Sequence, residues 1–459
     1  MTKDTRVERD SLGPLAVPAS ALWGIHTERA LLNFPISGIK LGSHRPLIRA
    51  LAHVKKAAAL TNRELGLIPS DVGTAIISAC DIVASGDVDD AFPIDVIQGG
   101  AGTSTNMNAN EVIANLALRI MGYPLGEYTV IDPIGHVNKC QSTNDVYPTA
   151  VRLALIYGLE TLLDSLAGLT TAFLEKGNAF ASIPKIGRTQ LQDAVPMTLG
   201  QEFAAFGVTL REDQGRLREA ASLLTECSLG ATAIGTGITA DPDYLERVID
   251  KLAQVTGLQL SRADDLVEAT WDTGAFMTFS GALKRTAIKL SKISSDLRLL
   301  SSGPQSGLSE ILLPPRQAGS SIMPGKVNPV IPEVVNQIAF FVAGADVTVT
   351  MAADNGQLQL NAFEPSIAHA LLQSLGWLAQ GCDVLNKLCV DGIAANEAHL
   401  RKQADMSTAQ ATALLPLIGY AAAADLAYRA SATGQKVVDL ALQEGLLSAA
   451  DAETMRAAR

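Results

Sequence analysis

Apolar residues recur at helical spacing along much of the chain. Between residues 155 and 173 they are separated alternately by four and three positions, which keeps them on one face of a helix for about five turns. The residues on this face are Leu155, Leu159, Leu162, Leu166, Leu169 and Phe173. Similar patterns predict long helices over residues 196–227, 264–301 and 365–389, and another that begins at Pro329. The pattern therefore predicts a helix bundle in the central part of the chain.

Shorter elements are expected on either side of this bundle. Residues 1–40 look extended and loop-like, helical periodicity runs over residues 46–63, and a further helix is expected over about 109–121. After residue 396 the predicted elements become short again. The fold class is therefore all-α. The predicted domains are a mostly helical N-terminal domain (1–143), a central helical-bundle domain (144–393) and a small C-terminal helical domain (394–459).

The composition favours a large, mostly aliphatic core. Hydrophobic residues make up 47% of the chain and aromatic residues only 5%, and Ala and Leu are strong helix formers. Charged residues are only 18% of the chain, so long helices with few charges leave apolar surface that a single bundle does not cover. We therefore expect these helices to pack against identical helices in a homo-oligomer.

Charge and cysteine usage argue against several classes of protein. The formal net charge is −11 and Lys and Arg do not cluster, which argues against a nucleic-acid binder. The five cysteines are expected to be free thiols in a reducing cytoplasm. Neither the cysteines nor the six histidines show metal-ligand spacing, so no metal site is expected. The chain start lacks the apolar core of a signal peptide. The apolar run over 411–424 is too short and broken to span a bilayer, so we expect a cytoplasmic protein with no membrane segment.

Four polar segments carry the candidate chemistry. Each holds several hydroxyl or amide side chains and is expected to lead into a helix: residues 102–106, 141–145, 187–193 and 319–330. One such side chain is enough to cap a helix, so the surplus suggests a ligand. In the last segment Asn328 is expected to be the N-cap and Pro329 the first helical residue. Hydroxyl donors at the positive ends of helices, together with Lys326, suit a small dicarboxylate.

Other catalytic motifs do not fit these segments. Ser320 lacks the Gly-x-Ser-x-Gly elbow and the nearby His of a serine hydrolase. Gly325 and Lys326 lack the upstream glycine and the following Ser or Thr of a phosphate-binding P-loop. The glycines at 99–102 are not part of the strand-turn-helix unit of a dinucleotide site. Simple helix capping stays the alternative for each polar segment taken singly.

The last of these segments resembles the signature of the aspartase/fumarase superfamily. The match covers Gly-Ser-Ser-Ile-Met-Pro-Gly-Lys-Val-Asn-Pro at 319–329. Further blocks resemble the family at 99–108, 136–145, 193–202 and 229–237. Thr143 and the run Thr-Gln-Leu-Gln-Asp-Ala-Val-Pro-Met at 189–197 resemble the aspartase branch, whereas class II fumarases carry His where this chain has Gln190.

The resemblance implies a fold, an assembly and a reaction. The expected fold has three largely helical domains around a long five-helix bundle, and four chains would form a homotetramer with a twenty-helix core. Active sites would be shared between three subunits. The expected reaction is the reversible elimination of ammonia from L-aspartate, which gives fumarate and ammonium. No organic cofactor or metal is expected to be required, and activation by Mg²⁺ is left open.

The resemblance also assigns roles to individual residues. Ser320 would be the general base on a mobile loop. Its removal of the Cβ proton would leave a carbanion or enediolate-type intermediate on the substrate. Lys326 would assist this base by favouring its alkoxide form and would bind the α-carboxylate together with Asn328. The β-carboxylate would contact Thr103, Ser142, Thr143 and Ser321. The amino group would face Asn144 and Thr189, with Gln190 near the α-carboxylate.

Three other functions are alternatives to this interpretation. A class II fumarate hydratase would interconvert malate and fumarate, and Gln190 argues against it. A lyase for a related N- or C-substituted succinate would fit the departures from the family pattern, such as Gln305 and Leu415. A catalytically silent relative of the lens-protein kind would not need Ser320 and Lys326, which this chain retains.

Overall fold

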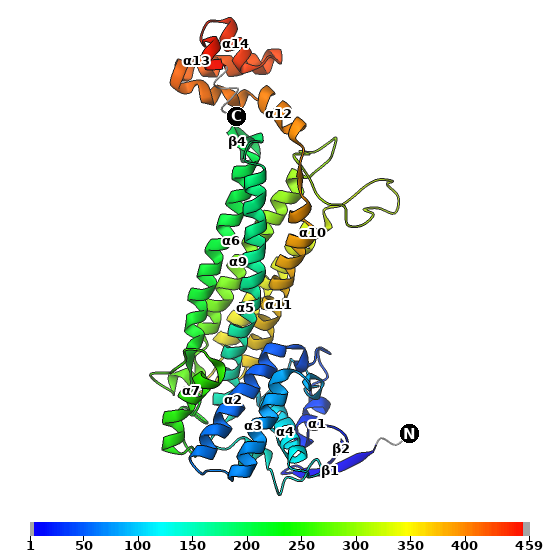
Figure 1. Cartoon of the computed structure of the whole chain (residues 1–459), viewed down its shortest axis with the longest axis vertical. Helices are drawn as coiled ribbons and strands as arrows, with labels where there is room; N and C mark the ends of the chain where they lie inside the picture. The colour runs from blue at the N-terminus through cyan, green and yellow to red at the C-terminus, as the bar shows by residue number, and fades with distance from the viewer. Residues whose placement is uncertain (1–3, 453–459) are drawn as a thin grey trace. The chain divides into compact units, whose positions relative to one another are not determined.

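The structure, a computed structural model, describes residues 4–452 and consists mostly of helices (Figure 1). The chain divides into two compact units, and each unit is built from three segments that are separated in the sequence. Unit 1 comprises Met1–Leu162, Gly215–Arg285 and Phe341–Trp377, and unit 2 comprises Leu163–Gln214, Thr286–Phe340 and Leu378–Arg459. The predicted division into three consecutive domains stays a prediction, and its outer ends, residues 1–3 and 453–459, lie outside the described residues.

Five long helices contribute residues to both units. They are α5 (Thr143–Ala179), α6 (Leu199–Ala221), α9 (Gly274–Leu300), α10 (Val330–Asp354) and α11 (Glu364–Leu388). The predicted apolar face from Leu155 to Phe173 lies on α5, and its six side chains are all buried. The predicted all-α fold with long bundle helices is therefore confirmed, whereas the tetramer core stays a prediction.

Side chains of the bundle helices interlock within each unit. In unit 2, Phe173 of α5 and Phe206 of α6 meet edge to face, with ring centroids 5.6 Å apart. In unit 1, the rings of Phe341 on α10 and Trp377 on α11 also meet edge to face, at 5.4 Å. Such aromatic pairs stabilise a packed interface beyond the area that they bury.

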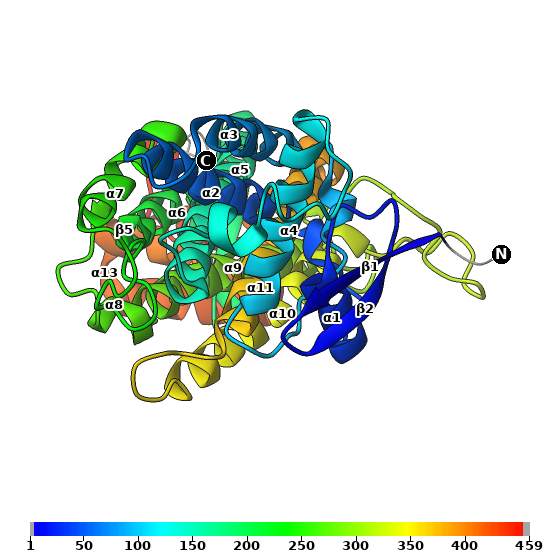
Figure 2. The same cartoon turned by 90° about the horizontal axis from the view of Figure 1, so that it is seen from below.

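The rest of unit 1 consists of a small hairpin and a layer of helices. The antiparallel strands are β1 (Thr5–Asp10) and β2 (Gly13–Pro18), and the helices are α1 (Ile25–Asn33), α2 (Arg45–Glu64), α3 (Ser70–Ser85), α4 (Thr103–Ile120), α7 (Pro242–Thr256) and α8 (Glu268–Trp271). Helices α2, α3 and α4 lie side by side (Figures 1 and 2). Short elements are η1 (Leu41–Ser43), η2 (Asp89–Ala91), η3 (Pro133–Val137), η4 (Ser222–Thr225) and the parallel pair β5 (Glu226–Cys227) and β6 (Ser261–Arg262).

The prediction that residues 1–40 are extended and loop-like agrees with the extended strands of this hairpin but was wrong for α1. The buried carboxylate of Glu111, on α4, accepts hydrogen bonds from the backbone N–H groups of Gly24 and His26, at 2.9 and 2.8 Å. It therefore caps the start of α1, which carries no cap of its own. A contact across 87 positions of the chain has no local sequence signature.

The rest of unit 2 consists of two short sheets and a group of C-terminal helices. Strands β3 (Pro184–Thr189) and β4 (Gln192–Thr198) form an antiparallel hairpin, and β7 (Ile311–Leu312) pairs with β8 (Ala394–Ala395). The remaining elements are η5 (Val390–Gly392), α12 (Glu397–Met406), η6 (Thr408–Gln410), α13 (Ala411–Thr433) and α14 (Val437–Gln443). Helix α13 is interrupted at Gly419, whose backbone is not helical, so two shorter helices meet there. The expectation of short elements after residue 396 agrees with this.

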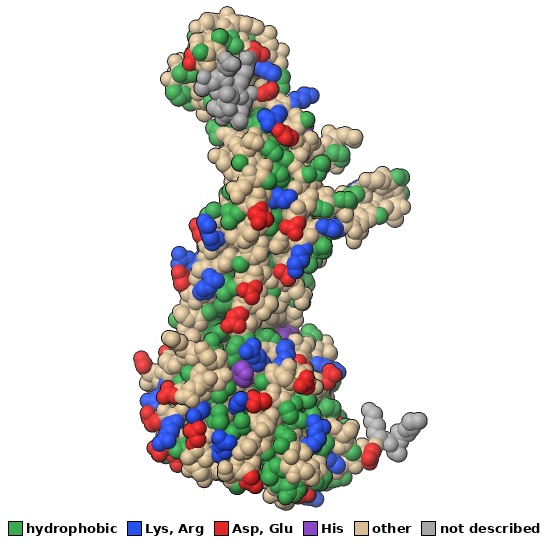
Figure 3. All heavy atoms as spheres, viewed as in Figure 1, with side chains coloured by type: hydrophobic (Ala, Val, Ile, Leu, Met, Phe, Trp, Pro, Cys, Tyr) green, Lys and Arg blue, Asp and Glu red, His purple; other side chains and the backbone are tan. Residues whose placement is uncertain are grey.

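Three helices in residues 4–452 are long and apolar enough to cross a membrane, judged by length and composition alone. They cover Thr143–Ala179, Val330–Asp354 and Thr408–Thr433, and the last of these, which contains the apolar run at 411–424, is broken at Gly419. Only 28% of the most apolar stretch of α10 is buried within this single chain. On the face drawn in Figure 3, positive and negative side chains are interspersed over the surface.

Candidate active site

The segment 319–328 forms a loop whose two ends are joined by hydrogen bonds. Gly319 N donates to Lys326 O at 2.8 Å, and Asn328 Nδ2 donates to Gly319 O at 2.8 Å. A Cβ atom at position 319 would lie 2.5 Å from Lys326 O, so only glycine fits. Helix α10 begins at Val330. The prediction that Asn328 caps this helix with its side chain was therefore wrong, because that side chain closes the loop instead.

Ser320 lies near one end of this loop, and its hydroxyl oxygen faces backbone donors. Ser320 Oγ accepts the N–H groups of Ile322 at 3.1 Å and Met323 at 2.9 Å. Hydrogen bonds from backbone N–H groups stabilise negative charge on the acceptor. The loop therefore places two backbone N–H donors at the Ser320 oxygen. The neighbouring Ser321 is exposed.

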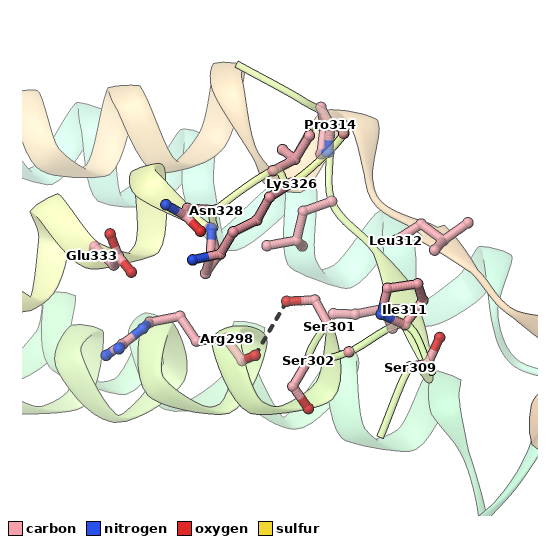
Figure 4. Close-up of a pocket in the computed structure, with 16 residues that line it drawn as sticks. Arg298, Ser301, Ser302, Ser309, Ile311, Leu312, Pro314, Lys326, Asn328 and Glu333 are labelled. Carbon is pink, nitrogen blue, oxygen red and sulfur yellow. Dashed lines mark hydrogen bonds between the residues drawn. The ribbon is translucent and has the colours of Figure 1, made fainter. Parts of the chain in front are cut away.

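A cavity of about 520 Å³ lies beside the loop, within unit 2. Figure 4 shows Lys326 and Asn328 on one side of it and Arg298, from α9, on the other, with Glu333 of α10 at one end. The lining thus combines two cationic side chains, one carboxylate and an amide, which suits a small polar anion. Sequence reasoning assigned no role to Arg298, because a single Arg in the last turn of a helix has an ordinary structural explanation.

The hairpin β3–β4 presents Thr189 and Gln190 at its tip. Thr189 pairs with Gln192, which leaves Gln190 and Leu191 as a two-residue turn. Both have positive φ angles, 55° and 63°, as a type I′ turn requires. The prediction that this segment leads directly into a helix was wrong, because β4 continues to Thr198 before α6 begins.

Replacing Leu191 with Gly is expected to stabilise this turn. A non-glycine residue in the left-handed region costs about 1–2 kcal/mol, and the Leu191 side chain is 70% exposed, so little packing is lost. We expect amide hydrogen exchange in β3 and β4, followed by mass spectrometry, to slow by roughly fivefold. Leu191→Ala keeps the strained backbone and is the matched control. Equal exchange in the two variants would contradict the expectation.

Two ion pairs fix the hairpin below its tip. The carboxylate of Glu310, which is fully buried, pairs with Arg188 of β3 and lies 2.8 Å from Lys185 Nζ. Asp193, on β4, accepts a hydrogen bond from Ser407 Oγ at 2.7 Å. The predicted binding residues at the tip are therefore held by partners far along the chain.

The polar segments of unit 1 form a second group of candidate residues. Thr103 is exposed at the first turn of α4, after three consecutive residues with positive φ, Gly100 to Gly102. A Cβ at Gly102 would lie 2.4 Å from the ring of Tyr147, so the close approach of this turn to α5 requires glycine. The helix prediction for 109–121 missed the first two turns of α4, because they are polar; the structure buries and hydrogen-bonds Thr105, Asn106 and Asn108 there.

Ser142, Thr143 and Asn144 lie half-buried at the start of α5. Thr143 Oγ1 accepts a hydrogen bond from Asn106 Nδ2 at 3.1 Å, and Asn144 Nδ2 donates to Ala233 O at 2.8 Å. The backbone N–H of Ser142 donates to Asp145 Oδ1 at 2.9 Å. A hydroxyl whose oxygen accepts one hydrogen bond can still donate its own hydrogen, so Thr143 keeps a donor.

Asp145 is a buried carboxylate that sequence reasoning did not single out. Besides Ser142, it accepts the backbone N–H groups of Gly230 and Thr232, both at 3.0 Å. Burial raises the pKa of Asp145 to about 6, although these hydrogen bonds and the charge of Lys55 oppose the shift. Its position three residues after Ser142 is a capping-box spacing, which was the available signal.

The predicted site residues thus fall into two groups. Thr103, Ser142, Thr143 and Asn144 belong to unit 1, whereas Thr189, Gln190, Ser320, Ser321, Lys326 and Asn328 belong to unit 2. A site built from several subunits would combine such groups, and it stays a prediction. Within residues 4–452, no group of three or more His, Cys, Asp or Glu side chains could hold a metal ion.

Known proteins match this chain over nearly its full length. The Lyase family model matches residues 13–344, and the Fumarase C C-terminus model matches residues 411–455. An aspartate ammonia-lyase from Pseudomonas aeruginosa is 56% identical over 97% of this chain and 94% of its own length.

Solved structures agree with this match. A fumarate lyase:delta crystallin from Brucella melitensis, bound to cobalt, has a TM-score of 0.95 and 55% identity, with 98% of both chains covered. A class II fumarase from Schistosoma mansoni reaches a TM-score of 0.91 at 34% identity, also with 98% of both chains covered. The predicted carbon–nitrogen lyase is confirmed by the curated relatives. Sequence, fold and loop agree that the chain belongs to the aspartase/fumarase superfamily.

Proposed function

We propose that this chain catalyses the reversible elimination of ammonia from L-aspartate to give fumarate. The observation that carries the proposal is Ser320 Oγ, which accepts two backbone N–H groups within a loop that also carries Lys326 and Asn328. A base and two carboxylate anchors on one short loop are what an elimination next to a carboxylate requires. Five curated relatives that are each named aspartate ammonia-lyase, at 50–56% identity, support the choice of substrate.

In the proposed reaction the Ser320 alkoxide takes the Cβ proton of aspartate. The electron pair left on Cβ is delocalised into the β-carboxylate as an enediolate-type intermediate, which then forms the Cα–Cβ double bond as the C–N bond breaks. Ammonia leaves with the bonding electrons and takes up a proton to become ammonium. Thr103, Ser142, Thr143 and Ser321 stabilise the charge on the β-carboxylate.

A serine base requires stabilisation of its alkoxide. Lowering the pKa of a hydroxyl by several units requires roughly 4–8 kcal/mol. Each hydrogen bond to a charged acceptor contributes about 1.5–3 kcal/mol, so the N–H groups of Ile322 and Met323 supply a large part of this. The charge of Lys326 and the exclusion of water by the loop supply the rest.

The remaining polar residues orient the substrate. Lys326 and Asn328 bind the α-carboxylate, with Gln190 near it. Thr189 and the Asn144 side-chain oxygen face the amino group, while the Asn144 NH₂ group is held by Ala233 O. The chemistry needs no organic cofactor or metal, and Mg²⁺ would act, if at all, as an activator.

The assembly we propose is a cytoplasmic homotetramer with active sites shared between three subunits. Helix α10 supports it, because its large apolar side chains include Phe340 at 65% and Met351 at 63% exposure in the single chain. Such side chains become buried when identical bundle helices pack together. The partners are then L-aspartate, fumarate and ammonium, with no nucleic acid and no membrane.

One assay tests the proposed reaction. The purified protein is incubated separately with L-aspartate and with L-malate, and fumarate is followed by its ultraviolet absorbance. We expect fumarate from aspartate and none from malate. Formation from malate alone would instead identify a fumarate hydratase. Formation from neither would point to a substituted succinate or to a catalytically silent relative, and would overturn the proposal.

A further inference from the structure

Lys55 lies on α2 in unit 1 and is completely buried. Its Nζ atom donates hydrogen bonds to two neutral amide oxygens, Asn138 Oδ1 at 2.8 Å and Gln141 Oε1 at 2.9 Å. Burying an ammonium group is costly unless a negative charge compensates it. These two partners satisfy its hydrogen bonds but do not neutralise its charge.

The partners of Lys55 belong to the start of α5. Gln141 immediately precedes Ser142. Asn138 Oδ1 also accepts from Asn106 Nδ2 at 3.1 Å, and the same NH₂ group donates to Thr143 Oγ1 at 3.1 Å. One connected set of hydrogen bonds therefore runs from the buried ammonium to a hydroxyl that we assign to the β-carboxylate.

Two ionisable groups act on Lys55 from the helices packed around it. Asp145, on α5, and Cys80, on α3, favour its charged form. Asp145 is already held by the backbone N–H groups of Ser142, Gly230 and Thr232. Burial outweighs both influences and lowers the pKa of Lys55 to about 7. The free protein at neutral pH therefore holds Lys55 only partly charged.

We propose that Lys55 is a positioning residue for the β-carboxylate, and that it takes up a proton when the dicarboxylate binds at the start of α5. The inference rests on the proposed function, because it takes the ligand beside Thr143 to be a dicarboxylate. An anion close to a partly neutral amine favours the charged amine. Binding of the anion and protonation of Lys55 therefore reinforce each other, as thermodynamic linkage requires.

Proton uptake on binding can be measured directly. The probe is succinate, a dicarboxylate that can neither lose ammonia nor add water, titrated calorimetrically into the full chain at pH 8. Repeating the titration in buffers with different ionisation heats gives the number of protons bound. We expect an uptake of about 0.5–1 proton per site at this pH. At pH 8 this uptake reports Lys55, because Asp145 titrates mainly below pH 7.

Two neighbouring lysines provide the matched variants. Lys55→Met is expected to abolish the proton uptake at pH 8 and to weaken succinate binding about tenfold at pH 7, or about 1.4 kcal/mol. Lys56→Met is the control, because Lys56 lies on the same helix but pairs with Asp81 at the surface, at 2.6 Å. It is expected to keep both the uptake and the affinity.

The possible outcomes separate the inference from the proposed function. Succinate binding by the unmodified protein without net proton uptake at pH 8 would overturn the inference, whether or not Lys55→Met folds. Unchanged uptake in a folded Lys55→Met protein would place the proton elsewhere and would also overturn it. Failure of the unmodified protein to bind succinate at all would overturn the proposed function, and the inference with it.

Discussion

Replacing Ser320 with Ala is expected to lower the turnover of L-aspartate by about 10²–10⁴-fold, the range that a general base contributes. The substitution removes the only atom of this side chain that can accept the Cβ proton. It leaves Lys326 and Asn328 in place, so binding of succinate should be largely retained. Fumarate absorbance measures the turnover, and calorimetry measures the binding.

Ser306→Ala is the matched control for this experiment. Ser306 is an exposed serine that precedes the loop in the same unit, and it does not line the cavity. Its replacement should leave turnover unchanged. Near-normal turnover in Ser320→Ala would rule out Ser320 as the base. Loss of binding together with turnover would assign Ser320 to the structure of the loop rather than to proton transfer.

Replacing Glu310 with Ala is expected to destabilise unit 2 by about 3–5 kcal/mol, because it removes the partner of buried cations. Lys185 has a side-chain exposure of only 2%, and Arg188 of 17%. Lys185 would keep Glu202, whereas Arg188 would lose the buried carboxylate that positions the hairpin. We therefore also expect a higher KM for aspartate, since Thr189 and Gln190 lie at the tip. Denaturant unfolding and steady-state kinetics measure the two effects.

Glu444→Ala is the control for charge removal at the surface of the same unit. Glu444 forms an ion pair with Arg429, and both side chains are substantially exposed. Exposed ion pairs contribute little to stability, so this variant should unfold like the unmodified protein. Glu310→Gln keeps a hydrogen-bond acceptor and should lie between the two. Equal stability of Glu310→Ala and Glu444→Ala would show that the buried pair does not hold the hairpin.

Helical periodicity predicted the bundle well because the long helices bury a regular apolar face. The helix expected over 365–389 is α11, Glu364–Leu388. The helix expected over 264–301 is interrupted after Trp271, where the Asp272 carboxylate accepts the backbone N–H of Gly274 and starts α9. Such breaks depend on one local hydrogen bond, to which apolar spacing is insensitive.

The candidate site was only partly accessible to sequence reasoning. The polar loop identified Ser320, Lys326 and Asn328, because so many functional groups in one glycine-containing run are unusual. Lys55 and Glu310 carry no comparable signal. The partner of Lys55, Asn138, lies 83 positions away in the chain, and Glu310 and Arg188 are separated by 122. Their roles depend on burial and on long-range contacts, which a single sequence does not display.

The joined ends of the 319–328 loop also lower the entropy cost of ordering the loop when substrate binds. Ordering ten free residues would cost roughly 10–20 kcal/mol of backbone conformational entropy. Two hydrogen bonds at Gly319 already close the loop in the unbound chain. Part of this entropy is therefore lost during folding rather than during binding. The substrate then meets a loop whose ends are already joined. More of the free energy of its contacts with Lys326 and Asn328 therefore remains available to stabilise the transition state.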